Sequence, residues 1–106
     1  MSIESSAKMR GSALTGELRK EAGLWLRARR EDLGLSQREL ARRVNMEYYT
    51  FISQIEGGRG RVPAERLEDW AAALELEPRD LAKTLMQYYD PYMYRLIFPA
   101  PEEETL

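Results

Sequence analysis

The spacing of helix-ending residues constrains the fold of this chain more than any other sequence feature. Glycine and asparagine accept the left-handed backbone that ends a helix, and proline cannot continue one. Residues of these types recur at short intervals: Gly34, Asn45, Gly57, Gly58, Pro63, Pro78 and Pro91. Because apolar residues between them follow helical spacing, the 106 residues are predicted to form one small all-α domain.

The pattern predicts five helices. They cover residues 17–33, 37–44 and 48–56, a stretch that starts near Pro63, and a stretch from Pro78 to Pro91. Ser36 is predicted to cap the second helix, and Glu39 to complete a capping box. Residues 1–16 are expected to be a flexible arm and residues 17–90 the folded domain. Residues 91–106 form a C-terminal extension, in which 92–98 are predicted to be extended and the end is an acidic tail.

Large apolar side chains at helical spacing are predicted to be core rather than a ligand pocket. They are Trp25, Phe51, Ile52, Trp70 and the leucines of the last two helices.

The composition argues against most enzyme classes. The chain has no cysteine and no histidine, so it lacks thiolate nucleophiles, Cys-ligated zinc, the commonest general base and the commonest metal ligand. Neighbouring carboxylates such as Glu31 and Asp32 point about 100° apart on a helix and cannot converge on one substrate. We therefore expect no catalytic residues, no metal and no cofactor. With no secretory signal and no long apolar stretch, a cytoplasmic, nucleoid-associated location is expected.

Charge is distributed unevenly along the sequence. Residues 1–61 hold 12 Lys and Arg against 8 Asp and Glu, whereas residues 62–106 hold 4 against 10. A net charge of −2 therefore hides a basic first half, which suits a surface that binds phosphates. The alternative is that these charges are simply solvated on a helical surface.

Two short predicted helices, joined by a tight turn and followed by a basic glycine-rich loop, have the geometry that projects a helix into the DNA major groove. The residues that carry this pattern are Gly23, Leu26, Arg27, Arg30, the GLSQ run at 34–37, Glu39-Leu40-Ala41, the ISQIE run at 52–56, and Gly58. Over residues 20 to 85 the chain resembles the Cro-repressor type, or XRE, family of helix-turn-helix regulators. The resemblance implies a lambda-repressor-like fold that binds double-stranded DNA.

The turn between the two motif runs is one residue longer than the commonest pattern of that family, so positions are counted back from Glu56. The resemblance then places base-reading residues at Tyr49, Thr50 and Gln54, with Ser53 beside them. Gln fits adenine, and Thr offers a hydroxyl and a methyl group to thymine. The alternatives are that Gln54 is an ordinary exposed residue and that one of Tyr48 and Tyr49 packs in the core.

Other residues are expected to position the protein on the DNA backbone. Gln37 resembles the family residue that meets a phosphate at a helix N-terminus. The expected phosphate contacts are Gln37, Arg38, Arg42, Arg43, Tyr48, Arg59 and Arg61. For each arginine alone, a solvated surface charge is an equal alternative. The resemblance also implies that Arg30 and Glu56 face each other as a partly buried structural ion pair.

The C-terminal extension is unusually apolar for a loose end. Residues 88–98 hold five of the ten aromatic residues of the chain. This segment either folds back on its own domain or forms an isologous dimer interface, and we favour the interface. The expected dimerisation residues are Tyr88, Tyr92, Tyr94, Leu96 and Phe98, with residues 92–98 able to pair as an antiparallel strand.

The sequence as a whole predicts a transcriptional regulator that reads an operator-like palindrome in the major groove as a homodimer. Repression of transcription is the expected outcome. The alternative is an antitoxin or a protein-binding adaptor that keeps the helix-turn-helix fold and captures a protein partner through the C-terminal extension.

Overall fold

The computed structural model describes residues 3–100, with side chains from residue 14 onward. Its elements are α1 (Ile3–Asp32), α2 (Gln37–Arg43), α3 (Thr50–Glu56), the 3-10 turn η1 (Ala64–Arg66), α4 (Leu67–Ala73), α5 (Pro78–Tyr89) and α6 (Pro91–Ile97). Every regular element within residues 3–100 is helical, which confirms the all-α prediction.

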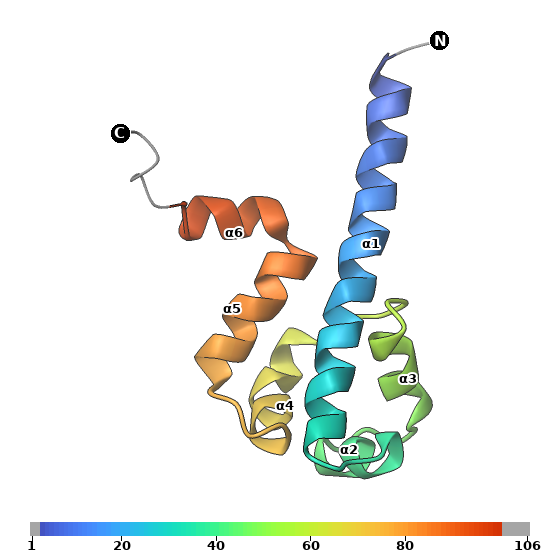
Figure 1. Cartoon of the computed structure of the whole chain (residues 1–106), viewed down its shortest axis with the longest axis vertical. Coiled ribbons are helices and arrows are strands. Elements are labelled where there is room, and N and C mark those ends of the chain that lie inside the picture. The colour runs from blue at the N-terminus through green and yellow to red at the C-terminus, as the bar shows by residue number, and fades with distance from the viewer. Residues whose placement is uncertain (1–2, 101–106) are drawn as a thin grey trace.

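The long helix α1 is the axis of the fold (Figure 1). The C-terminal half of α1 contacts α3 on one side and α5 on the other, while α2 packs against α3 and α4. The short helix α6 lies at the opposite end of the molecule from α2 and contacts α5. None of the helices in the described part of the chain combines the length and apolarity that a membrane span requires.

One apolar core joins the first five helices. Leu26 of α1, Leu40 of α2, Ile52 of α3, Trp70 of α4 and Leu81 of α5 are all fully buried. Each such side chain contributes about 1.5–3 kcal/mol when buried. The short helices α2 and α3 are therefore held by tertiary packing, since helices of seven residues are not stable alone.

The junction between α1 and α2 has the predicted capping chemistry. Gly34 has φ of 73°, and the Leu35 amide donates to the Arg30 carbonyl at 3.1 Å, which closes the end of α1. The Ser36 hydroxyl accepts a hydrogen bond from the Glu39 amide at 3.0 Å and caps α2. The carboxylate of Glu39 accepts hydrogen bonds from Arg42 and Arg43 instead of capping the helix. Only the Ser36 hydrogen bond of the expected capping box is therefore formed.

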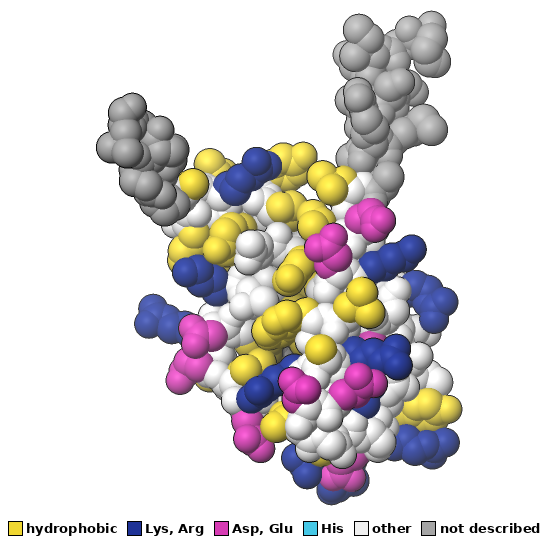
Figure 2. Space-filling model, in the orientation of Figure 1, with side chains coloured by type: hydrophobic (Ala, Val, Ile, Leu, Met, Phe, Trp, Pro, Cys, Tyr) yellow, Lys and Arg dark blue, Asp and Glu magenta, His cyan; other side chains and the backbone are white. Residues whose placement is uncertain are grey.

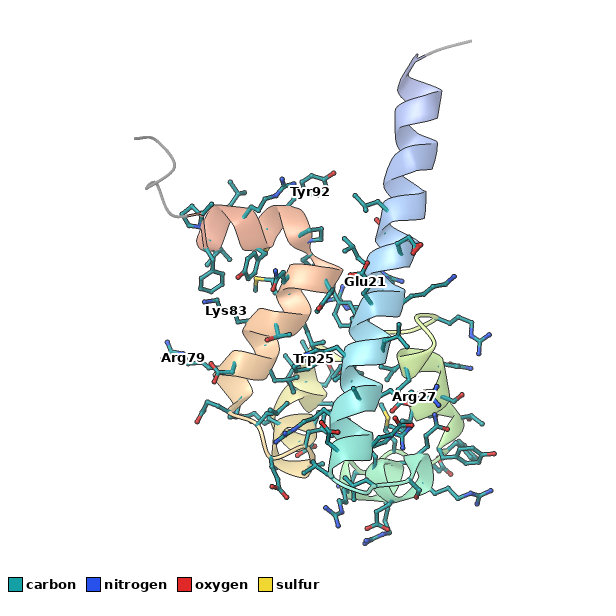
Figure 3. All side chains as sticks on the ribbon, viewed as in Figure 1. Glu21, Trp25, Arg27, Arg79, Lys83 and Tyr92 are labelled. Carbon is teal, nitrogen blue, oxygen red and sulfur yellow. The ribbon has the colours of Figure 1, made fainter. Side chains whose placement is uncertain are left out.

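Arg29 holds the end of α4 against α1. Its guanidinium donates to the carbonyl of Leu74 at 2.8 Å, an orphan acceptor at the C-terminus of α4, and to the carbonyl of Glu75 just beyond the helix at 3.0 Å. Glu75 adopts φ of 57° just after α4, a left-handed position that is unusual for glutamate. Trp25, one turn before Arg29, lies on the side of α1 that faces α5 (Figure 3) and packs against the core.

Residues 3–16, which were expected to be a flexible arm, are helical in the structure, because α1 already begins at Ile3. This segment contains no proline, and good helix formers such as Ala7, Lys8 and Arg10 lie between its serines and glycines. Once the packed part of α1 is formed, each added residue extends an existing helix at little cost. Residues 1–2 lie outside the described residues.

The prediction of an extended segment at residues 92–98 is wrong, since residues 91–97 form α6. Proline has no amide hydrogen to lose in the first turn of a helix, so Pro91 ends α5 and begins the next helix. The Tyr94 and Phe98 rings lie 5.1 Å apart, four residues along the chain, as helical spacing requires. The described residues therefore contain six α-helices rather than five, and the predicted antiparallel strand has no counterpart. The acidic tail at residues 101–106 lies outside the described residues.

Candidate nucleic-acid interface

The turn between α2 and α3 spans residues 44–49 and is fixed at both ends. Val44 is fully buried at the end of α2, and Asn45 has φ of 58°, the left-handed turn position that its residue type predicted. The Met46 amide then donates to the Ala41 carbonyl at 2.9 Å. Helix α3 begins at Thr50, two residues later than predicted, so the extra turn residue lengthens the connection rather than the helix.

The two sides of α3 differ in residue type. Ile52, Ile55 and Glu56 are buried against the rest of the domain. Thr50 and Gln54 lie one helical turn apart on the exposed side, and Ser53 beside them is half-buried. The exposed side therefore presents a hydroxyl, a methyl group and an amide, which are groups able to meet base edges.

Three aromatic side chains near the start of α3 are exposed. Tyr48 is 57%, Tyr49 39% and Phe51 45% exposed, so the prediction that Phe51 is core is wrong, and so is the alternative that one of the tyrosines is buried. The reason is geometric, because Phe51 points about 100° away from Ile52 on the helix. Since Ile52 and Ile55 already fill the inner face, the ring of Phe51 is left at the surface.

Arg30 and Glu56 meet in a buried, two-pronged ion pair. Nε and Nη2 of Arg30 donate to the two carboxylate oxygens of Glu56 at 2.6 and 3.0 Å, and both side chains are more than nine-tenths buried. The hydrogen bond to Glu56 raises the pKa of Arg30, against the opposing effect of burial. The pair ties the end of α3 to α1 with the fixed orientation that a guanidinium–carboxylate fork provides.

Two further contacts complete this network. Nη1 of Arg30 donates to the Leu35 carbonyl at 2.6 Å, and Nε2 of Gln37 donates to Glu56 at 3.0 Å. The Gln37 side chain, which was expected to meet a phosphate, is thus engaged within the domain. At Gly23 a Cβ atom would lie only 2.1 Å from the Glu56 carbonyl oxygen. α1 and α3 therefore approach backbone to backbone at this point, which only glycine allows.

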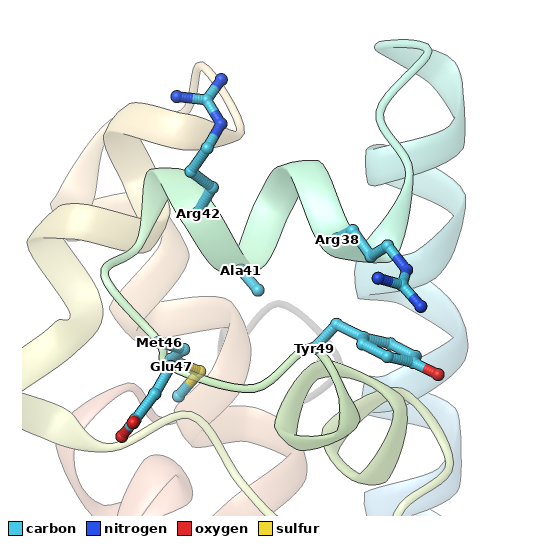
Figure 4. Close-up of a pocket in the computed structure, with 6 residues that line it drawn as sticks. All are labelled: Arg38, Ala41, Arg42, Met46, Glu47 and Tyr49. Atoms are coloured by element: carbon cyan, nitrogen blue, oxygen red, sulfur yellow. The ribbon is translucent and has the colours of Figure 1, made fainter.

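The arginines of α2 lie along the outer side of the motif. The Arg38 guanidinium lies 4.4 Å from the centre of the Tyr49 ring, at the edge of a shallow hollow of about 280 Å³ between α2 and the turn (Figure 4). Arg42 and Arg43 both pair with Glu39 and lower the pKa of its carboxyl group. These exposed pairs are weak, so all three arginines can reach an anion outside the protein.

The two arginines of the glycine-rich loop have different surroundings. Arg59 is exposed, and none of the ion pairs among the described residues includes it. Arg61 pairs with Asp90 at 3.0 Å, and its guanidinium lies 4.6 Å from the centre of the Tyr89 ring. The structure thus ties Arg61 to the α5–α6 junction and does not bring it together with the arginines of α2.

The expected dimerisation residues do not form one exposed set. Tyr88 is half-buried and packs against the core, and Tyr94 is half-buried. Phe98 lies under the Lys83 ammonium group, 4.5 Å from the ring centre. Tyr92 and Leu96 are the most exposed large apolar residues, at 70% and 84%. Figure 2 shows hydrophobic side chains gathered over α6, whereas Lys and Arg are spread over the view and stand beside Asp and Glu at the end that holds α2.

Comparison with known proteins adds one finding. Residues 21–85 match the family described as a helix-turn-helix domain. No curated protein and no solved structure matched the chain. The match includes α2, α3, α4 and most of α5, covers well over half of the chain, and leaves out the start of α1 and all of α6. Such domains typically belong to DNA-binding regulators rather than to enzymes. The match is consistent with the XRE type that the sequence motifs resemble, and the chain belongs to the helix-turn-helix domain family.

Proposed function

We propose that this protein is a sequence-specific DNA-binding regulator that represses transcription by occupying an operator-like duplex. The observation that carries the proposal is the exposed side of α3, which offers Thr50 and Gln54 to a partner in a chain of the helix-turn-helix family. A helix presented in this way enters the major groove, where base pairs differ in their hydrogen-bonding edges.

Base readout is assigned to the exposed polar residues of α3 and its start. The Gln54 amide suits the N6 and N7 atoms of adenine, and Thr50 suits thymine. Tyr49 and Ser53 lie next to them along the chain, where the tyrosine hydroxyl and the half-buried serine can contact the sugar or a base edge.

Phosphate contacts are assigned to cations on both sides of α3. Arg38, Arg42 and Arg43 of α2 lie on one side, and Arg59 follows the end of α3. The backbone amides at the start of α2 and the Tyr48 hydroxyl add neutral donors. These groups hold the domain on any duplex and carry no sequence information, whereas the α3 side chains do.

The same regulator is proposed to act as a homodimer on a palindrome in the cytoplasm. Exposed Tyr92, Met93, Leu96 and Ile97 make α6 an apolar surface of the composition that protein interfaces favour. Two copies joined there present two α3 helices, and successive major grooves on one DNA face lie about 34 Å apart.

The test is selection of bound duplexes from a random pool by the full chain. The proposal predicts enrichment of a palindromic sequence. Arg38→Ala should weaken binding to all duplexes and reduce the salt dependence by about one unit of slope. Arg79→Ala is the matched control, because it removes the same charge from the outer side of α5 (Figure 3), away from α2 and α3.

Two results would contradict the proposal. The first is a selected pool without any enriched sequence, which would leave the α3 surface without a DNA target. The second is an equal loss of affinity in Arg38→Ala and Arg79→Ala, which would mean that charge alone, wherever it lies on the molecule, attracts the duplex.

A further inference from the structure

We propose that Phe51, positioned by Tyr48, reads the 5-methyl group of thymine in the major groove, so that the preferred site requires thymine at a position that no polar side chain specifies. This inference rests on the proposed DNA-binding function. It assigns a specificity role to a residue that sequence reasoning placed in the core and that the structure leaves 45% exposed.

The position of Phe51 on α3 places it beside the polar readout residues. Successive helical residues are about 100° apart, so Phe51 flanks the line formed by Thr50 and Gln54, on the side opposite Ser53. Thr50, Ser53 and Gln54 all lie in the first two turns of α3, where a helix in the major groove contacts base edges. A duplex that meets Gln54 therefore also meets the ring of Phe51.

Tyr48 limits the freedom of the Phe51 ring. The two ring centres are 6.2 Å apart at an angle of 56°, within the range of favourable tilted aromatic pairs. The Phe51 amide also donates to the Tyr48 carbonyl at 3.1 Å, so the backbones of the two residues are held together. Because Tyr48 is itself 57% exposed, the pair forms a small apolar ridge rather than a buried cluster.

The surroundings of this ridge favour DNA over an apolar protein surface. Arg38 lies at the neighbouring Tyr49 ring, and Arg59, which is in none of the ion pairs found between described side chains, follows the end of the same helix. Cations on both sides of α3 match a groove bordered by two phosphate backbones. Within that groove the thymine 5-methyl is the apolar group that base edges offer, and phenylalanine is among the side chains that contact it.

The experiment replaces thymine by deoxyuridine, one position at a time, in the duplex selected by the full chain. This change removes the methyl group and keeps the hydrogen-bonding edge of the base. The wild-type protein should bind about four-fold more weakly at one or two such positions, the value expected for one buried methyl group. Phe51→Ala should bind the thymine and deoxyuridine duplexes equally well at those positions.

Variants on the same surface separate methyl readout from general damage. Gln54→Ala is the matched control, because it should lower affinity and still distinguish thymine from deoxyuridine at the Phe51 positions. Phe51→Leu, which keeps an apolar side chain, should retain part of the discrimination. Tyr48→Ala should reduce it without abolishing it, since the ring of Phe51 is then less firmly held. Circular dichroism checks that each variant folds, as expected for exposed positions.

The inference is overturned if the wild type binds every deoxyuridine duplex as tightly as the thymine duplex, or if Phe51→Ala keeps the discrimination. In both cases sequence-specific binding persists, so the proposed function stands and the exposed ring is left for a protein partner. If no duplex is enriched at all, the proposed function fails and this inference fails with it.

Discussion

The two ends of the molecule both expose aromatic side chains, but they are built differently. At the α2–α3 end, Tyr48, Tyr49 and Phe51 are exposed together with polar and cationic groups. That end is fixed to α1 by the buried pair of Arg30 and Glu56. At the α6 end the exposed residues are mostly apolar, and the main contact of α6 is with α5. The family match includes the first end and excludes the second.

This difference separates two kinds of recognition. A surface of mixed polar, cationic and aromatic groups on a rigid support suits a nucleic acid, whose partner groups have fixed positions. A mostly apolar surface on a terminal helix suits another protein surface, because its stabilisation depends on the area removed from water.

The largest effect is expected at the buried ion pair. Arg30→Ala leaves Glu56 charged without its partner, and we expect a loss of about 3–5 kcal/mol in the free energy of unfolding. Glu31→Ala is the control, because it removes an exposed pair with Arg27 and should cost under about 1 kcal/mol. Denaturant unfolding of these two variants, of Glu56→Ala, and of the Arg30→Ala, Glu56→Ala double variant tests this. Additive losses in the double variant would mean that the pair contributes no coupling.

The next largest effect is expected for Leu96→Asp, which places a charge on the most exposed apolar residue of α6. The fold should remain, but the proposed dimer should dissociate, and affinity for a duplex with two half-sites should fall on the order of a hundredfold. Affinity for a single half-site should be unchanged. Ala28→Asp adds the same charge on an exposed position of α1 and serves as the control in sedimentation. A Leu96→Asp protein that still sediments as a dimer would exclude α6 as the interface.

A smaller effect is expected at Tyr89, where the domain joins α6. Its hydroxyl oxygen accepts from the Val62 amide at 3.3 Å, and burial raises the pKa of its phenol. A raised pKa in the folded state means that the stability from Tyr89 is complete below about pH 10 and is lost as pH rises further. Tyr89→Phe should cost about 0.5–1.5 kcal/mol at neutral pH and remove this alkaline loss. An unchanged alkaline loss in the variant would assign it to other groups.

The sequence predicted the α2–α3 end well because its local signals and its core agree. Gly34, Ser36 and Asn45 adopt the backbone or capping roles that their residue types favour, and these roles need no distant partner. The largely apolar run at 92–98 suits a strand or a short helix equally. Only Pro91, which fits the first turn of a helix, favours the helix over the strand. The helix at residues 3–16 was missed because the prediction relied on apolar residues at helical spacing. A segment that continues an existing helix needs no such residues, since it needs no core.

The missed site residue has a similar cause. Phe51 is apolar at a helical position, and residue type alone favours burial. In a seven-residue helix that lies against the core on one side, the neighbouring Ile52 and Ile55 take that side. The signal that could have found Phe51 is the run Tyr-Tyr-Thr-Phe-Ile, which holds more large side chains than one helix face can bury. The links from Gln37 to Glu56 and from Arg61 to Asp90 depend on tertiary positions that spacing does not give.

Sequence readout by α3 is tested most directly by comparing Gln54→Ala with Arg59→Ala on the selected duplex and on random DNA. If α3 reads sequence, Gln54→Ala should cost about 1–3 kcal/mol on the selected duplex, relax the preference at one base pair, and leave random DNA binding unchanged. Arg59→Ala should weaken both duplexes alike and lower the salt dependence by about one unit of slope. If both variants shift the two duplexes equally, α3 does not read the sequence.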